Sequence, residues 1–137
     1  MAKYRYLLDT YTVSELIKNP QGVIAERMLS SGLELQCCIS IIVSCALRYS
    51  AEKNQSPKLS FNVEQVLNSL PILPLEEPID ELYSKIRVSL ENKGVSLSHH
   101  DLLVAAHALS LGLTVVTKND EKFSHIENLK VENWLID

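Results

Sequence analysis

Apolar residues occur along the chain in two patterns, as short continuous runs and as longer stretches with helical spacing. Short runs bounded by turn residues are typical of buried strands. They predict strands at residues 4–8, 35–39, 71–74, 113–116 and 129–135. Prolines flank the third run, so we expect there a short strand that does not lie in the middle of a sheet.

Helical spacing fills most of the segments between these runs, with polar caps, prolines and glycines at the ends. It predicts helices at residues 12–18, 21–31, 41–52, 61–70, 76–92 and 98–112, with Ser40 as an N-cap and a loop or single turn at residues 117–123. Strands that alternate with helices need crossover connections, which favour parallel pairing. We therefore predict an α/β protein with three α/β/α layers. Its mostly parallel central sheet has four or five strands covered by helices, and residues 1–137 form a single domain.

The composition is that of a folded globular protein, with 46% hydrophobic and 22% charged residues. A net charge of −4 argues against a simple binder of duplex nucleic acid, but it suits an acidic centre that holds metal ions. The three cysteines, Cys37, Cys38 and Cys45, lack the spacing of a zinc site, so we expect buried thiols in a reducing cytosol. Residues 1–5 contain no signal-peptide core, and no apolar run approaches the roughly 20 residues that span a bilayer. We expect a cytoplasmic protein without membrane contact.

Polar residues stand where two of the predicted strands end. Asp9 follows the first strand, and Thr117, Asn119 and Asp120 follow the strand at residues 113–116. Asp101 lies in the first turn of the preceding helix. Ligands bind at the carboxyl ends of parallel strands, and oxygen ligands suit Mg²⁺ or Mn²⁺.

Each carboxylate also has a structural interpretation that involves no metal. Asp9 can cap the helix that follows it, and Asp101 can stabilise a helix N-terminus through the helix dipole. Asp120 can be a solvated turn residue. The residues alone leave both interpretations open.

The chain resembles PIN-domain toxins of the VapC type. The segment Leu7-Leu8-Asp9-Thr10 is similar to the family's opening motif, Leu-Leu-Asp-Thr-Asn. The other similar segments are residues 39–53, Gly94 with residues 101–109, residues 116–123 and residues 131–134. The resemblance covers nearly the whole chain in the right order.

The resemblance implies a PIN-like fold and a metal-dependent endoribonuclease, a toxin of a type II toxin-antitoxin system that acts on RNA, often tRNA. Three or four acidic residues of this family bind one or two ions, Mg²⁺ or Mn²⁺, and Asp9 and Asp101 match the first and third of these acids. The fourth falls on Asn119 or Asp120, and Thr10, Thr117 and Glu15 are expected to support the site. The resemblance also implies a VapB-like antitoxin as partner, and a homodimer.

One expected acid is missing, because Ala46 stands where the family has glutamate in its second block. Tyr11, Val43 and Ser50 also replace the family's usual asparagine, threonine and glycine. Three explanations stay open: an engineered substitution, natural decay of the toxin, or compensation by another acid such as Glu15 or Glu52. The alternative function is a catalytically inactive PIN domain that binds an antitoxin or RNA.

Overall fold

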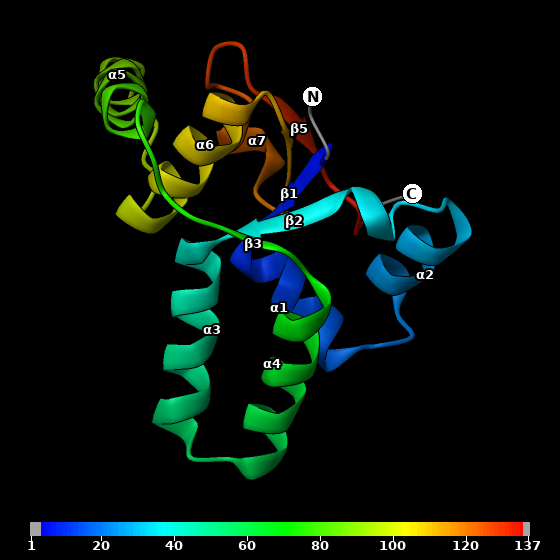
Figure 1. The fold of residues 1–137 in the computed structure, drawn as a ribbon. Helices are drawn as coiled ribbons and strands as arrows, with labels where there is room; N and C mark the ends of the chain where they lie inside the picture. Colours follow the sequence, from blue (N-terminus) through cyan, green and yellow to red (C-terminus); the bar gives the residue numbers. More distant parts are fainter. Residues whose placement is uncertain (1–3, 136–137) are drawn as a thin grey trace.

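A single parallel sheet organises the chain in the computed structural model, which describes residues 4–135. Its strands are β1 (Tyr6–Leu8), β2 (Cys37–Ser40), β3 (Ile72–Leu73), β4 (Thr114–Val116) and β5 (Lys130–Glu132). The strand order is β3-β2-β1-β4-β5, and all neighbours pair in parallel (Figure 1). The predicted parallel sheet of four or five strands is confirmed, and the short proline-flanked β3 lies at an edge.

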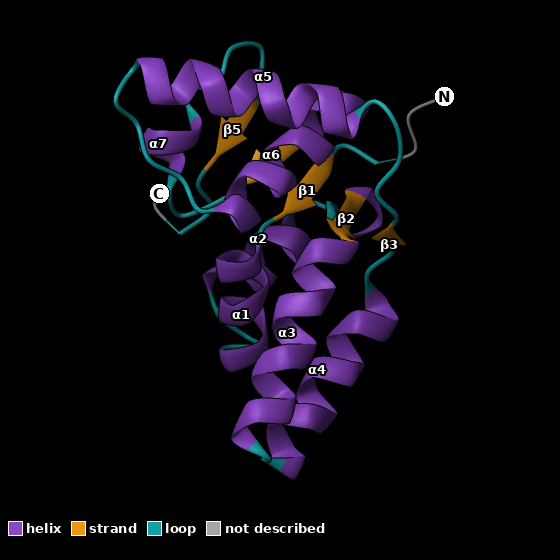
Figure 2. Cartoon of the chain, turned by 90° about the vertical axis from the view of Figure 1, so that its left-hand side faces the viewer, coloured by secondary structure: helices purple, strands orange, loops and turns teal. Residues whose placement is uncertain are grey.

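Helices cover both faces of this sheet. They are α1 (Thr10–Lys18), α2 (Val23–Ser30), α3 (Ile41–Asn54), α4 (Pro57–Ser69), α5 (Ile79–Asn92), α6 (His99–Leu111) and the short α7 (Asp120–Phe123). Figures 1 and 2 show α5 and α6 on one face and α1, α3 and α4 on the other, with α3 and α4 extending together away from the sheet. The three-layer α/β/α prediction is therefore confirmed. None of the helices within residues 4–135 is long and apolar enough to cross a membrane.

The interior strands of the sheet contribute much of the core. Leu7 and Leu8 of β1 and Val115 and Val116 of β4 are fully buried, because helices cover both faces of the sheet. This explains why these strands are continuous apolar runs in the sequence. At the end of the chain Trp134 is also buried, and its ring meets the ring of Tyr6 edge to face with centroids 5.0 Å apart.

Several predicted boundaries differ from the structure. The helix expected from residue 61 begins at Pro57, where Ser56 caps it, and the extended segment expected at residues 129–135 is a strand only at Lys130–Glu132. Three further differences also have local reasons. The strand expected at residues 35–39 is preceded by a 3-10 turn, η1 (Glu34–Gln36), and begins only at Cys37. The helix expected from residue 76 begins at Ile79, because a residue that precedes proline, here Glu77, is disfavoured in helical conformation. Helix α1 begins two residues earlier than expected, at Thr10, directly after Asp9.

The cysteine prediction was right for two residues and wrong for the third. Cys37 and Cys38 are buried in β2, and burial raises the pKa of both thiols to about 12, which makes them unreactive. Cys45 is exposed, because α3 turns its Val43, Leu47 and Ala51 face to the core and Cys45 away from it. Residues 1–3 and 136–137 lie outside the described range, so the domain bounds of 1–137 and the part of the N-terminal prediction that falls on residues 1–3 stay predictions.

Candidate functional site

Asp9 stands at the carboxyl end of β1, beside the end of β4. Its backbone N–H donates to the carbonyl of Val116 (3.0 Å), and its carboxylate accepts a hydrogen bond from the backbone N–H of Thr12 (2.9 Å). The Thr12 hydroxyl donates to the same Val116 carbonyl (3.0 Å). Asp9 is therefore the N-cap of α1 and is also fixed to the sheet edge, with only 4% of its surface exposed.

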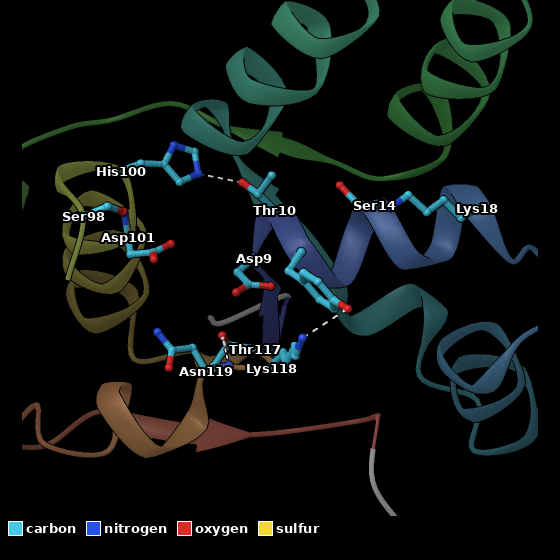
Figure 3. Close-up of a pocket in the computed structure, with 11 residues that line it drawn as sticks. Asp9, Thr10, Ser14, Lys18, Ser98, His100, Asp101, Thr117, Lys118 and Asn119 are labelled. Carbon is cyan, nitrogen blue, oxygen red and sulfur yellow. Dashed lines mark hydrogen bonds between the residues drawn. The ribbon is translucent and has the colours of Figure 1, made fainter. Parts of the chain in front are cut away.

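Asp101 reaches the same edge from α6. Ser98 caps this helix by accepting from the backbone N–H of Asp101 (3.1 Å), which fixes Asp101 in the first turn. The half-buried carboxylate points toward Asp9, as Figure 3 shows. The positive end of the helix dipole favours an anion at this position.

The pKa of Asp9 is raised above its ordinary value, chiefly because burial disfavours the charged carboxylate. Hydrogen bonds from Thr117 and Thr12 oppose this shift, and the nearby charge of Asp101 adds to it. A cation between the two carboxylates would offset both the burial and the repulsion. The electrostatics therefore favour a bound positive charge.

Both carboxylates line a pocket of about 610 Å³ that opens at the sheet edge. Besides Asp9 and Asp101, its lining consists of hydroxyl and amide groups, basic side chains and one tyrosine: Thr10, Ser14, Ser98, Thr117, Asn119, Lys18, His100, Lys118 and Tyr11. The pocket thus combines an acidic end, where Asp9 and Asp101 meet, with two lysines and a histidine. Such a mixture suits a phosphate ester held beside a cation.

Five of the predicted site residues meet in this pocket: Asp9, Asp101, Asn119, Thr10 and Thr117. Asp120 does not line it, and its carboxylate instead accepts a hydrogen bond from the side-chain amide of Asn133 (3.2 Å). Glu15 also lies outside, where its carboxylate accepts from Asn19 (3.1 Å). Ala46 lies half-buried on α3 and does not line the pocket.

The donor set fits a hard cation with few protein ligands. Among residues 4–135, no group of three or more histidine, cysteine, aspartate or glutamate side chains is placed to hold a metal ion. Two carboxylates remain, with the amide of Asn119 and the hydroxyl of Thr117 nearby. Mg²⁺ is commonly bound by one or two carboxylates and retains several waters, so this pair is compatible with it.

Four further pocket residues with reactive or charged side chains were not predicted from the sequence: Tyr11, Lys18, Lys118 and His100. His100 Nε2 lies 2.6 Å from the hydroxyl of Thr10, and His100 directly precedes Asp101 in the first turn of α6, on the same side of the pocket (Figure 3). One signal was available, because Tyr11 and Lys18 are seven residues apart and so lie on one face of a helix. The other two depend on where loops and helix ends meet in space.

The chain belongs to the PIN-domain family, because residues 6–129 match the PIN domain. Within this family it groups with the VapC proteins. It is 34% identical over 131 residues to the "tRNA(fMet)-specific endonuclease VapC" of Salmonella typhimurium, covering 95% of this chain and 98% of the relative. It is 32% identical over 133 residues to "Ribonuclease VapC2" of Haemophilus influenzae, covering 96% of this chain and 98% of the relative.

Solved structures agree with this assignment. The DNA-bound VapBC of Salmonella typhimurium matches with a TM-score of 0.84 and 34% identity, covering 96% of this chain and 98% of the other. VapBC2 of Rickettsia felis, bound to a DNA fragment from its promoter, matches with a TM-score of 0.83 and 30% identity, covering 94% of this chain and 98% of the other. The resemblance inferred from the sequence motifs is confirmed.

Proposed function

We propose that this chain is a metal-dependent endoribonuclease, the VapC-type toxin of a type II toxin-antitoxin system, and that it acts on cytoplasmic RNA, with tRNA as the first substrate class. The observation that carries this proposal is the meeting of Asp9 and Asp101 at the acidic end of the pocket. Two relatives that the chain matches over nearly their full length are named as a tRNA-specific endonuclease and a ribonuclease.

Each pocket residue has a role in this proposal. Asp9 and Asp101 hold Mg²⁺ or Mn²⁺, and Asn119 supplies a neutral oxygen. Such an ion, when bound, supplies Lewis acidity and neutralises charge on the phosphate. Hydrogen bonds from Thr117 and Thr12 to the Asp9 carboxylate lower its pKa against the larger effect of burial, and so favour the ionised form that a cation binds.

Asn119 is favoured over Asp120 as the last ligand, because Asn119 lines the pocket while Asp120 does not. Thr10 has a different supporting role: its hydroxyl contacts His100, so it connects the start of α1, beside Asp9, to the first turn of α6, beside Asp101. Glu15 has no role in this scheme, since its carboxylate contacts Asn19 outside the pocket.

Ala46 weakens the proposed activity, since a methyl group cannot bind a cation. A second function follows from the same observation: a PIN domain without catalysis that binds its antitoxin or RNA. The small number of carboxylates that meet within residues 4–135 favours this second function. The retained pair of Asp9 and Asp101 favours the first.

An RNA cleavage assay separates the two functions. The wild-type chain, Ala46→Glu and Asp9→Asn are incubated with total tRNA in Mg²⁺ or Mn²⁺. The nuclease proposal expects slow cleavage by the wild type, faster cleavage by Ala46→Glu and none by Asp9→Asn. Absence of cleavage by both the wild type and Ala46→Glu would rule out the nuclease and leave the binding module.

We also propose a VapB-like antitoxin as partner and a homodimer as the functional unit. Support for the partner comes from the matched structures, which are of VapBC2 from Rickettsia felis and VapBC from Salmonella typhimurium. Co-purification with the product of an adjacent antitoxin gene tests the first, and light scattering of the purified chain tests the second. A monomer at micromolar concentration would contradict the homodimer.

A further inference from the structure

The pocket contains a tyrosine that the proposed metal chemistry does not use. Tyr11, in the first turn of α1, lines the pocket and keeps 40% of its surface exposed. An aromatic ring that keeps part of its surface exposed inside a polar pocket gains from a flat partner that covers the exposed part.

A cation holds this ring in place. Lys118, which follows β4, places its ammonium 4.5 Å from the centroid of the Tyr11 ring and 3.5 Å from its hydroxyl. The contact joins the first turn of α1 to the loop that carries Asn119. It therefore positions the ring beside the acidic end of the pocket.

The exposed side of α1 continues the pocket away from the carboxylates. Tyr11, Ser14 and Lys18 all line it, and their spacing of three and four residues places them on one helix face. Figure 3 shows Ser14 and Lys18 following one another along α1, beyond Thr10. Seven residues of helix rise by about 10 Å, which extends the pocket well past a single phosphate.

We infer that this face of α1, with Lys118, binds an unpaired nucleotide next to the phosphate to be cut: its base stacks on Tyr11 and a neighbouring phosphate pairs with Lys18. The inference rests on the proposed function, because it names how RNA would enter the pocket. Stacking on an aromatic ring requires a base free of its pair, so the subsite selects single-stranded regions over duplex. The net charge of −4 agrees with this, since two lysines among residues 4–135 line the pocket and no broad basic face is needed.

The test asks whether the effect of replacing Tyr11 on RNA binding depends on the presence of one particular base in the strand. Every protein carries Asp101→Asn, so that the RNA stays intact in Mg²⁺, and binding of labelled eight-nucleotide single strands is followed by fluorescence anisotropy. Tyr11→Leu should weaken binding about tenfold or more, within the range measured for lost base stacking, while Tyr11→Phe should not. An abasic site moved along the strand should abolish the effect of Tyr11→Leu at one position.

The structure supplies a matched control. Tyr49 on α3 is also exposed and also has a lysine over its ring, Lys53 at 5.8 Å, but it lies outside the pocket. Tyr49→Leu should leave RNA affinity unchanged. Lys18→Gln should reduce the slope of log affinity against log salt by about 0.7, the value for one phosphate contact to a single strand, whereas Lys53→Gln should not.

The outcomes separate this inference from the proposed function. The nucleotide subsite is wrong if the Tyr11→Leu protein binds every strand with the same affinity as the protein that retains Tyr11. It is also wrong if the substitution weakens only the binding of the antitoxin. Either result would count even if Asp9-dependent cleavage is found. If the chain cleaves nothing but shows the coupling between Tyr11 and one base, the subsite stands and the nuclease proposal falls. Failure to bind any single strand would overturn the subsite.

Discussion

Replacing Asp9 separates its structural role from its proposed role as a metal ligand. Asp9 caps α1 through its side-chain oxygen, and asparagine caps helices as well as aspartate does. Burial raises the pKa of Asp9, so the ionised carboxylate is less favourable in the folded protein than in the unfolded chain. The contribution of Asp9 to the unfolding free energy is therefore present below its pKa in the unfolded chain. It is lost as the pH rises through its raised pKa in the folded protein. At pH 7 without metal, Asp9→Asn should therefore be at least as stable as the wild type.

Bound Mg²⁺ should reverse this order of stability and make the wild type more stable than Asp9→Asn. Removing one unit charge about 4 Å from a divalent ion costs about 2 kcal/mol even at the dielectric constant of water, or about 30-fold in affinity. At a Mg²⁺ concentration 100 times the wild-type Kd, the ion should stabilise the wild type by about 2.7 kcal/mol but Asp9→Asn by only about 0.9 kcal/mol. The matched variant Asp9→Ala should behave like Asp9→Asn toward Mg²⁺, and should also lose about 1 kcal/mol from the missing cap.

Urea unfolding with and without Mg²⁺ measures these differences directly. The decisive quantity is the gain in unfolding free energy on adding the ion, compared between wild type and Asp9→Asn. An equal gain in both proteins would refute the assignment of Asp9 as a metal ligand. A metal-free Asp9→Asn that is clearly less stable than the wild type would refute the electrostatic reasoning behind it.

Three further predictions concern side chains around this site and in the core. Burial lowers the pKa of His107, so its protonation occurs more readily in the unfolded chain, and the unfolding free energy should fall as the pH drops below about 6.5. His107→Gln should flatten that dependence, and an unchanged slope between pH 7 and pH 5.5 in urea unfolding would contradict it. Ser98→Ala should cost about 1 kcal/mol in unfolding free energy, because Ser98 caps α6, and should weaken Mg²⁺ binding less than Asp101→Asn does by calorimetry. Trp134→Ala should cost about 3–5 kcal/mol, because the ring is 1% exposed and packs on Tyr6, and a loss below 1 kcal/mol in urea would show that this packing is dispensable.

The sequence by itself determined the order and type of the elements, because their signals are local. Ser40, Ser56 and Ser98 accept hydrogen bonds from backbone N–H groups at the starts of α3, α4 and α6. Gly112 ends α6 in the left-handed conformation that glycine adopts without strain. Alternation of such helices with apolar runs was enough to predict a parallel sheet with its polar edge at Asp9.

Only the tertiary structure decided which polar residues share the pocket, because that depends on how separate elements are rotated and how loops end. Asn119 and Asp120 are adjacent in sequence, yet only Asn119 lines the pocket, while Asp120 begins α7 and contacts Asn133. The contact between Tyr11 and Lys118 joins residues 107 positions apart, so no local pattern contains it. Periodicity fixes which face of an element is buried, but the neighbours of an exposed side chain depend on the packing of the other elements.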